Sequence, residues 1–316
     1  GNNKKKTLTF YNHYDVQPPE PLEKWKTEPF TPTIIDGRIY ARGVADNKGS
    51  FLSRVCAVDA YKKIYGELPV NIKFITEGEE EVGSVHLDEF RIKYPEKLAT
   101  NGIVWEGGSK DINRGPLQIT LGCKGLCYIE LRCRGAKKDL HSMNAAVVIN
   151  PAWRLIWALN TMKNEKDVIM IDGFYDDVIK PTKEDMHYLD CFNYDEERIK
   201  SSVGINSFIN DLKGTDLKEK YLYQPTCNIA GFGSGYTGEG GKTVLPSYAF
   251  CKIDLRLVEG QDAEKTVKLI RKHLDKRGFT DIEVVMLSGD NPYRADANSA
   301  IVKASLESAE EIYGMK

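Results

Sequence analysis

The sequence predicts an α/β protein with two parts: a mainly parallel sheet with helices on both faces, and an inserted ferredoxin-like α+β module. Two observations support this prediction. Between residues 1 and 115, short apolar runs with strand character alternate with helical patterns, which is typical of a parallel sheet covered by helices. After Pro116 the run PLQITLGCKGLCYIELRCRG alternates between apolar and polar residues, which is typical of antiparallel strands.

The first part contains three strand-like runs: KKKTLTFYNHYDV, VNIKFIT and NGIVWEGG. A strand pair is expected in TPTIIDGRIYARG, with its turn at the Asp-Gly pair of residues 36–37. One helix is expected over SFLSRVCAVDAYKKIYG and another over about residues 84–94. The apolar residues of the first helix recur at helical spacing: Phe51, Val55, Val58 and Tyr65.

The second part follows the order strand-helix-strand-strand-helix-strand of a ferredoxin-like module. Its helices are NPAWRLIWALNTMK and DAEKTVKLIRKHLDKRG, KTVLPSYAFCKIDLRLVEG is a strand pair broken at Pro246, and DIEVVML is the last strand. We interpret residues 163–224 as charged and irregular. The predicted domains are therefore residues 1–115, an inserted module over 116–289, and a return to the first domain over 290–316, with a helix from about Ser299.

Composition argues against several kinds of partner. The 316 residues carry 44 Lys and Arg against 46 Asp and Glu, so a net charge of −2 does not favour a nucleic-acid partner. No apolar run is long enough for a membrane span. The seven cysteines contain no C-x-x-C pair, which favours reduced thiols in the cytoplasm. For Cys123, Cys127 and Cys133, on one strand-like run, we favour core packing over metal binding.

Acidic residues gather where the strand VNIKFIT ends. The stretch FITEGEEEVGS places four glutamates within five positions, and like charges this close repel each other: Glu77, Glu79, Glu80 and Glu81. A polyvalent cation would neutralise them. Active groups of parallel sheets collect at the carboxyl ends of the strands, and further candidate ligands lie there. They are His13, Asp15 and Glu106 at strand ends, and Asp46 in a turn before a helix.

Histidine nitrogens and carboxylate oxygens are ligands that zinc accepts. Asp15 follows His13 by two residues on the same strand face, so it is placed to accept the second ring N–H of that histidine. Glu80 and Glu81 should point to opposite sides of an extended chain, so that one holds a metal while the other faces a substrate. Taken singly, an H-x-D pair, a glutamate triplet and an Asp-Asn-Lys-Gly turn are usually ordinary surface features. Their order and placement together are far more specific.

The motifs FYNHYDVQP, DGRIYARGVADNKG, EGEEEVGS, WEGG and DLHS, with the intervening Trp25 and PF-x-P, occur in the order of a known family. The chain resembles the di-zinc metallopeptidase and deacylase family over about residues 7–313. This family includes carnosinase-like dipeptidases, glutamate carboxypeptidase, aminoacylase, acetylornithine deacetylase and succinyl-diaminopimelate desuccinylase. The resemblance implies a zinc-exopeptidase-like fold with an inserted lid and dimerisation domain.

The resemblance also implies a role for each acidic residue. His13 and Glu106 would hold one zinc, Glu81 the other, and Asp46 would bridge both. Glu80 would be the general base for a metal-bridging water, and the two metals would lower the pKa of that water and polarise the amide carbonyl. Asp15 would support His13, and the Asp46–Asn47 peptide is often cis in such proteins. Glu77 and Glu79 receive no ligand role.

In the inserted domain, the family uses the DLHS histidine, here His141, to hold the developing oxyanion in the active site of a partner subunit. GGKTVLP and IDLRLV match segments that line the pocket for the substrate carboxylate. Thr243 and Arg256 are therefore candidate substrate-binding residues, and the arginine fork suits a carboxylate. Asn228, in PTCNIAG, is a further candidate. The ordinary alternatives to a substrate-binding role are that Thr243 only packs against its neighbours and that Arg256 only faces solvent.

The family's second zinc takes a further histidine, and none of His86, His187 and His273 stands in a matching context. We therefore expect that both ends of the natural protein are absent from this chain and that its second zinc site is incomplete. The chain alone should then be inactive, with at most one well-coordinated metal, at His13.

The function implied is a homodimeric hydrolase with two zinc ions per subunit that cleaves small peptides, of the dipeptidase or carboxypeptidase type. Co²⁺ or Mn²⁺ would suit the same ligands. The long region between Asn150 and Gln224 favours the dipeptidase branch. One alternative is an N-acyl amino acid deacylase, such as a desuccinylase or deacetylase. A non-catalytic relative is a second alternative, and the intact candidate ligands argue against it.

Overall fold

The computed structural model describes residue 1 and residues 3–106 and 118–314. The chain divides into two compact units, Gly1–Ile119 with Ala297–Lys316, and Thr120–Asp296. The expected boundary at residue 115 lies outside the described residues. The chain returns to the first unit a few residues after the expected position, 290.

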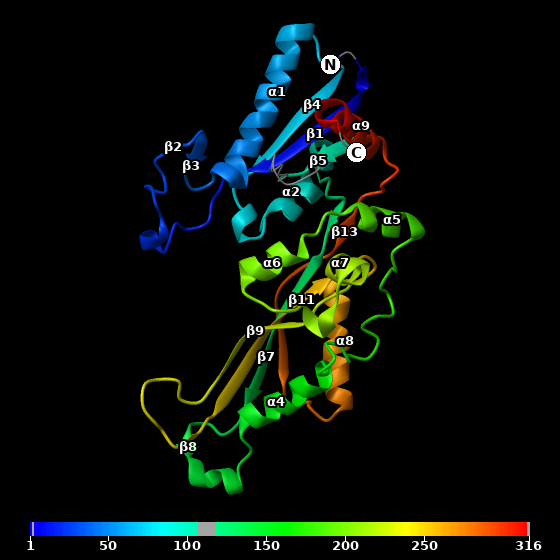
Figure 1. Cartoon of the computed structure of the whole chain (residues 1–316). Coiled ribbons are helices and arrows are strands. Elements are labelled where there is room, and N and C mark those ends of the chain that lie inside the picture. Colours follow the sequence, from blue (N-terminus) through cyan, green and yellow to red (C-terminus); the bar gives the residue numbers. More distant parts are fainter. Residues whose placement is uncertain (2, 107–117, 315–316) are drawn as a thin grey trace. The chain divides into compact units, whose positions relative to one another are not determined.

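The sheet of the first unit consists of three parallel strands in the order β4-β1-β5 (Figure 1). These strands are β1 (Asn3–His13), β4 (Val70–Glu77) and β5 (Gly102–Val104). The three predicted runs thus form a parallel sheet, as expected. His13 pairs with Glu77 in register, and Glu106 follows two residues after β5. Because the strands run in one direction, these polar residues meet at one edge of the sheet.

The helices of the first unit are α1 (Gly49–Tyr65), α2 (Leu87–Lys93), α3 (Pro95–Leu98) and α9 (Ala300–Tyr313). Phe51 of α1 packs edge-on against Phe74 of β4, with ring centroids 6.1 Å apart. A Cβ at Gly102 would lie 2.9 Å from Ile301 Cδ1, so this glycine leaves room for α9. Strand register places Phe74 and Gly102 on one face of the sheet, which α1 and α9 therefore share.

The predicted apolar stripe of α1 was only partly right. Val55 and Tyr65 are exposed, whereas the side that faces the sheet carries Phe51, Arg54 and Val58. The predicted strand pair is confirmed as β2 (Thr33–Ile35) and β3 (Arg38–Tyr40), which turn at residues 36–37 with positive φ at both. The other short elements of this unit are η1 (Leu22–Lys24), η2 (Val44–Lys48) and η3 (Glu80–Val82).

The second unit contains a four-stranded antiparallel sheet in the order β12-β7-β11-β9 (Figure 1). Along the chain the elements are β7 (Gly125–Arg134), α4 (Pro151–Met162), β9 (Asn228–Ser234), β11 (Tyr248–Leu257), α8 (Ala263–Lys276) and β12 (Glu283–Asp290). This is the predicted ferredoxin-like order. The second strand is β9, however, and not the KTVL run, which forms only the short strand β10 (Val244–Leu245) beside β8 (Leu140–His141).

The core of the second unit lies between one face of this sheet and both helices. Every second residue of β7 is buried, including Cys127, Ile129 and Cys133, and these side chains meet Leu155 of α4 and Ile270 of α8. Two of the three cysteines on the predicted run are therefore core residues, as expected, while Cys123 is exposed. The opposite sheet face stays partly open to solvent.

The interpretation of residues 163–224 as irregular was wrong. They include α5 (Lys183–Cys191), α6 (Glu196–Val203), η5 (Ile209–Asp211) and α7 (Gly214–Tyr223). Thr182 and Asp185 form a reciprocal capping box at the start of α5, a local signal visible in the sequence. The remaining short elements are β6 (Gly122–Cys123), η4 (Ser142–Ala146) and β13 (Tyr293–Arg294). Within the described residues, every helix lacks the length and hydrophobicity that a bilayer-spanning helix needs.

Candidate metal centre

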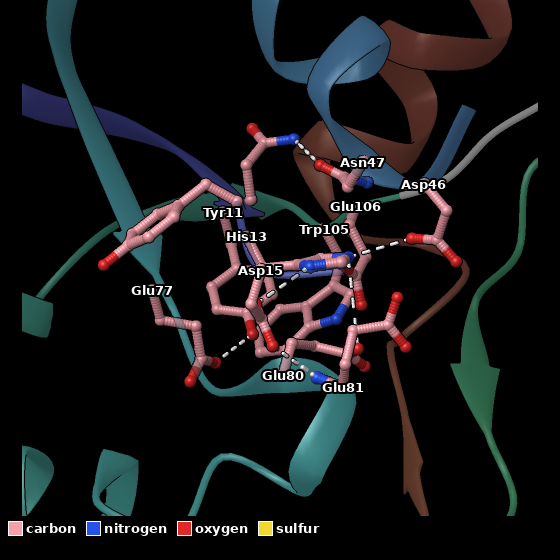
Figure 2. A network of polar contacts seen from close by, with 12 residues as sticks. Tyr11, His13, Asp15, Asp46, Asn47, Glu77, Glu80, Glu81, Trp105 and Glu106 are labelled. Carbon is pink, nitrogen blue, oxygen red and sulfur yellow. Dashed lines mark hydrogen bonds and ion pairs between the residues drawn. The ribbon is translucent and has the colours of Figure 1, made fainter. Parts of the chain in front are cut away.

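The side chain of His13 lies at the end of β1 and is only 1% exposed. Its Nδ1 lies 3.2 Å from Asp15 Oδ1. Its Nε2 faces carboxylate oxygens of three other residues, at 2.9 Å from Asp46, 3.1 Å from Glu106 and 3.9 Å from Glu80 (Figure 2). One ring nitrogen carries at most one proton, so it cannot donate to all three.

These residues fit a divalent metal ion. If the Nδ1–H of His13 is donated to Asp15, the lone pair of Nε2 faces the carboxylates, and only a cation satisfies all of them. The buried Oε2 atom of Glu106 has no hydrogen-bond partner in the described part of the chain. Two sets of potential ligands have their atoms within 4.8 Å of one another: His13, Glu80 and Glu106, and His13, Asp46 and Glu81.

Glu80 and Glu81 lie in the 3₁₀ turn η3, and not in an extended chain as predicted. Successive side chains of such a turn still diverge, because three residues complete one turn. Glu80 belongs to the set with Glu106, whereas Glu81 belongs to the set with Asp46. The backbone N–H of Glu81 is donated to Asp15 Oδ2 at 2.9 Å, which ties this turn to the segment after β1.

The electrostatics of the cluster reflect crowded negative charge. Burial, and next the charge of Glu80, raise the pKa of Glu106 to about 7. Burial also raises the pKa of Glu80, although nearby His13 opposes this shift. Burial alone would lower the pKa of His13, but Asp46 and Glu106 outweigh it and raise that pKa. Each shift lowers the net negative charge of the cluster, which a bound cation would also do.

The other two glutamates of EGEEEVGS lie outside these sets, as expected. Glu77 accepts hydrogen bonds from the hydroxyl groups of Tyr11 and of Ser84, the latter at 2.8 Å. Glu79 pairs with His86, whose Nδ1 lies 2.8 Å from its carboxylate. The strand end therefore divides its acidic residues between the centre and its surroundings.

Sequence reasoning missed Arg54, Asn12 and Asn47. Arg54 lies on the sheet-facing side of α1 and hydrogen-bonds to the ends of β1 and β5, while Asn12 donates to the side chain of Asn47. One signal for Arg54 was present in the sequence. It is a charged residue on the apolar side of a helix, three positions after Phe51 and four before Val58. The Asp46–Asn47 peptide is cis, as the resemblance implies.

In the second unit, the structure brings His141 and Thr243 together. His141 pairs with Val244 across β8 and β10, and the backbone N–H of Ser142 is donated to the Thr243 carbonyl at 3.2 Å. The exposed His141 ring accepts the Met143 backbone N–H at Nδ1, at 3.2 Å. Because Nδ1 accepts this bond, the corresponding neutral tautomer carries its proton on Nε2, which has no protein partner in the described part of the chain.

Arg256 and Asn228 lie together at the other end of β11. Thr226 N donates to the Arg256 carbonyl at 3.0 Å, and Asn228 Nδ2 donates to Asp254 at 2.7 Å. Arg256 is exposed, and its guanidinium has no ion pair within the part of the chain that the structure describes. Arg256 lies eight positions after Tyr248, which is at the end of β11 near β10, so the two are roughly 25 Å apart along the strand. Thr243 precedes β10 and Arg256 lies near the end of β11, so the two candidates lie on segments toward opposite ends of this strand.

Comparison with known proteins shows the family of this chain. The sequence matches the description "Peptidase family M20/M25/M40" over residues 9–316, and the chain belongs to this family. The family expected from the sequence motifs is thereby confirmed.

Two curated relatives and one solved structure illustrate the similarity. Human Beta-Ala-His dipeptidase is 32% identical over 98% of this chain and 62% of its own length. The Cys-Gly metallodipeptidase dug1 of Schizosaccharomyces pombe is 32% identical over 86% of this chain and 58% of its own length. The M20 family metallo-carboxypeptidase Sso-CP2 of Sulfolobus solfataricus superimposes with a TM-score of 0.92 at 43% identity, covering 99% of this chain and 71% of that chain. The chain thus spans about three fifths of the length of these curated relatives.

Proposed function

We propose that this chain belongs to a zinc-dependent peptidase that hydrolyses the amide bond of small peptides, of the dipeptidase or carboxypeptidase type. One observation carries the proposal: three carboxylates converge on Nε2 of the buried His13, and a cation would satisfy all of them. The similarity to two dipeptidases and a metallo-carboxypeptidase supports the same class of reaction.

His13, Asp46, Glu81 and Glu106 would hold the metal, with Asp46 shared between two zinc ions per subunit. Such ions supply an acidified water and polarise the substrate carbonyl. Glu80 would act as the general base, because its carboxylate lies 3.9 Å from His13 Nε2 and is 34% exposed, so it borders the centre and remains accessible. Asp15 would orient the His13 ring through Nδ1.

The substrate pocket would be assembled from two subunits. His141, with the free donor at Nε2, would stabilise the oxyanion, and Thr243 beside it would enter the same pocket. Arg256 and Asn228 would belong to the other subunit, where the exposed guanidinium of Arg256 would bind the substrate carboxylate. The position of Arg256 near the far end of β11 from β10 supports this division between subunits.

A homodimer through the inserted unit is supported by its surface. The outward side of α4 exposes Trp153 by 56% and Trp157 by 54%, and their rings lie 6.1 Å apart. Because α4 packs on β7 and β11 and α8 packs on β7 and β12, α4 lies toward the open edge strand β9. An open edge beside exposed aromatic residues is a surface that a second copy can cover.

The cytoplasm is the proposed compartment, since all seven cysteines are free thiols.

A hydrolysis screen tests the proposed function. The whole protein is incubated with dipeptides, longer peptides and N-acyl amino acids, with zinc and with a chelator. Hydrolysis of peptides that requires zinc would support the proposal. Activity confined to N-acyl amino acids would favour a deacylase, and absence of metal binding at the His13 cluster would contradict a metal-dependent function altogether.

A further inference from the structure

We propose that Arg54 is a positioning residue that sets the geometry of the metal centre by holding its ligand-bearing segments together. The inference rests on the proposed function, because it concerns the same centre. Arg54 contacts none of the candidate ligands through its own hydrogen bonds. It acts through the residues next to them.

The guanidinium of Arg54 joins the ends of two strands. Nη1 donates to the Tyr11 carbonyl at 2.6 Å and to Asn12 Oδ1 at 2.9 Å, and Nη2 donates to the Trp105 carbonyl. Tyr11 and Asn12 immediately precede His13, whereas Trp105 immediately precedes Glu106. One planar group thus fixes the backbone before a histidine ligand and before a carboxylate ligand.

Hydrogen bonds between the paired strands do not reach far enough to fix the backbone before Glu106. The register of β1 with β5 ends at Phe10 and Val104, so Glu106 lies two residues beyond the last paired position. The bonds from Arg54 continue the connection past that point, and the stacked rings of Tyr11 and Trp105, with centroids 3.8 Å apart, extend it on the sheet face. Without Arg54, the Trp105 carbonyl would lose its hydrogen bond to the group that holds β1, and only the ring stack and the contact between His13 and Glu106 would position this segment.

A third segment is reached through one intermediate. Asn12, fully buried, uses its oxygen for Arg54 and donates Nδ2 to the Asn47 side chain. Asn47 directly follows Asp46, the proposed bridging ligand. Arg54 is therefore connected to the segments of His13, Glu106 and Asp46. Figure 2 shows Asn47 and Asp46 together on the side of the cluster that faces α1.

Holding these three acceptors at once requires an arginine. A guanidinium presents several N–H groups in a fixed plane, so it can serve two backbone carbonyls and one amide oxygen at once. A lysine would retain the charge, but its single nitrogen on a flexible stem cannot hold the same three acceptors in a fixed arrangement. Substitution by lysine therefore separates the effect of geometry from that of charge.

The test compares Arg54→Lys and Arg54→Met with Arg91→Met, a control in which an exposed arginine paired with Asp88 on α2 is lost. Zinc affinity is measured by competition with a chromogenic chelator, and the Co²⁺-loaded proteins are compared by visible absorption. Circular dichroism of the metal-free proteins reports folding. We expect both Arg54 variants to bind zinc roughly 10–100-fold more weakly, as for other groups that orient ligands, and to show altered Co²⁺ bands, while the control matches the parent.

Parent-like affinity and Co²⁺ bands in folded Arg54→Lys would overturn the inference, and this variant decides if Arg54→Met fails to fold. Failure of the unsubstituted protein to bind zinc or Co²⁺ would instead overturn the proposed function and, with it, this inference. The two failures are thus distinguishable without any measurement of activity.

Discussion

Asp15 holds the ring of His13 and the turn of the glutamate pair with one carboxylate. Its Oδ1 lies 3.2 Å from His13 Nδ1, and its Oδ2 accepts the Glu81 N–H at 2.9 Å. Burial alone would raise the pKa of Asp15. Hydrogen bonds from the backbone N–H of Glu81 and of neighbouring residues outweigh burial and lower this pKa, so Asp15 stays ionised. A fixed anion at Nδ1 orients the other ring nitrogen toward the proposed metal position.

Replacing Asp15 should therefore weaken metal binding. In Asp15→Asn the neutral amide no longer favours a proton on Nδ1, and we expect roughly 10–100-fold weaker zinc affinity. Chelator competition measures it, with Asp59→Asn on the exposed side of α1 as the matched control. Equal affinity of Asp15→Asn and the control would contradict a role of Asp15 in orienting His13.

The two adjacent glutamates should behave differently. In the whole protein, Glu80→Gln should lower kcat by about 10²–10⁴-fold with metal content retained, because only proton transfer is lost. Glu81→Gln should lower metal content as well as activity, because a ligand is lost. Metal analysis of the purified variants beside peptide hydrolysis rates distinguishes the two roles. Loss of metal in Glu80→Gln, or near-normal activity of that variant, would show that the assignment of the pair is shifted by one residue.

His141→Ala should lower kcat in the whole protein by an amount typical of an oxyanion donor, about 2.7–4 kcal/mol in activation free energy, with metal content unchanged. If His141 acts in the partner's site, mixing His141→Ala with Glu80→Gln should restore part of the activity, since a hybrid dimer contains one site with both residues intact. Subunit exchange is verified by mass spectrometry of isotope-labelled protein. Exchange without any restored activity would exclude the role between subunits.

The exposed tryptophans of α4 should stabilise the proposed dimer. Loss of a buried interface tryptophan often costs about 2 kcal/mol or more, which is roughly 30-fold in Kd. Sedimentation velocity over a range of concentrations should therefore show Trp153→Ser/Trp157→Ser shifted toward monomer. Val203→Ser, which removes an exposed apolar side chain from α6, serves as the control. A dimer of unchanged Kd in the double variant would place the interface elsewhere.

His273 predicts a pH dependence of stability that is independent of the metal centre. It is fully buried in α8, where Nδ1 accepts the Asp172 N–H at 3.2 Å and Nε2 lies 3.1 Å from Thr161 Oγ1. Burial, and next the charge of Arg277, lower the pKa of His273 below its ordinary value of 6.5, although Asp172 opposes this. Protonation would place a hydrogen on Nδ1, against the Asp172 donor.

Because the folded state resists this proton and the unfolded state binds it, the contribution to stability is fully present above pH 6.5 and decreases as the pH falls below it. The slope is at most about 1.4 kcal/mol per pH unit for one proton. His273→Gln keeps one donor and one acceptor but does not titrate. Denaturant unfolding of both proteins between pH 8 and pH 5 should show the smaller loss of stability in His273→Gln. Parallel curves would contradict the prediction.

Local sequence patterns were enough to predict much of this protein. Short apolar runs predict the strands of the first unit. Polar residues at the ends of parallel strands meet at one edge of the sheet. For that reason His13, Asp15, Glu80, Glu81 and Glu106 could be grouped from the sequence, and the structure brings all of them, with Asp46, to that edge. The same holds for the alternation of β7 and β11, which predicts one buried face.

Only the tertiary structure decided which distant residues are in contact and how far apart the candidate site residues lie. Arg54 reaches residues 42 to 51 positions away, and such contacts leave no periodic trace in the sequence. The missed strand β9 is recognisable chiefly by its pairing with β11, because a Gly-rich run has little strand propensity of its own. Thr243 and Arg256 are only 13 positions apart in the sequence, but β11 runs between them, so they lie toward opposite ends of that strand. The sequence determined which groups are present and on which local elements, because period and propensity act over a few residues. Their separations were decided by packing and hydrogen bonds between distant segments, which no short stretch of sequence contains.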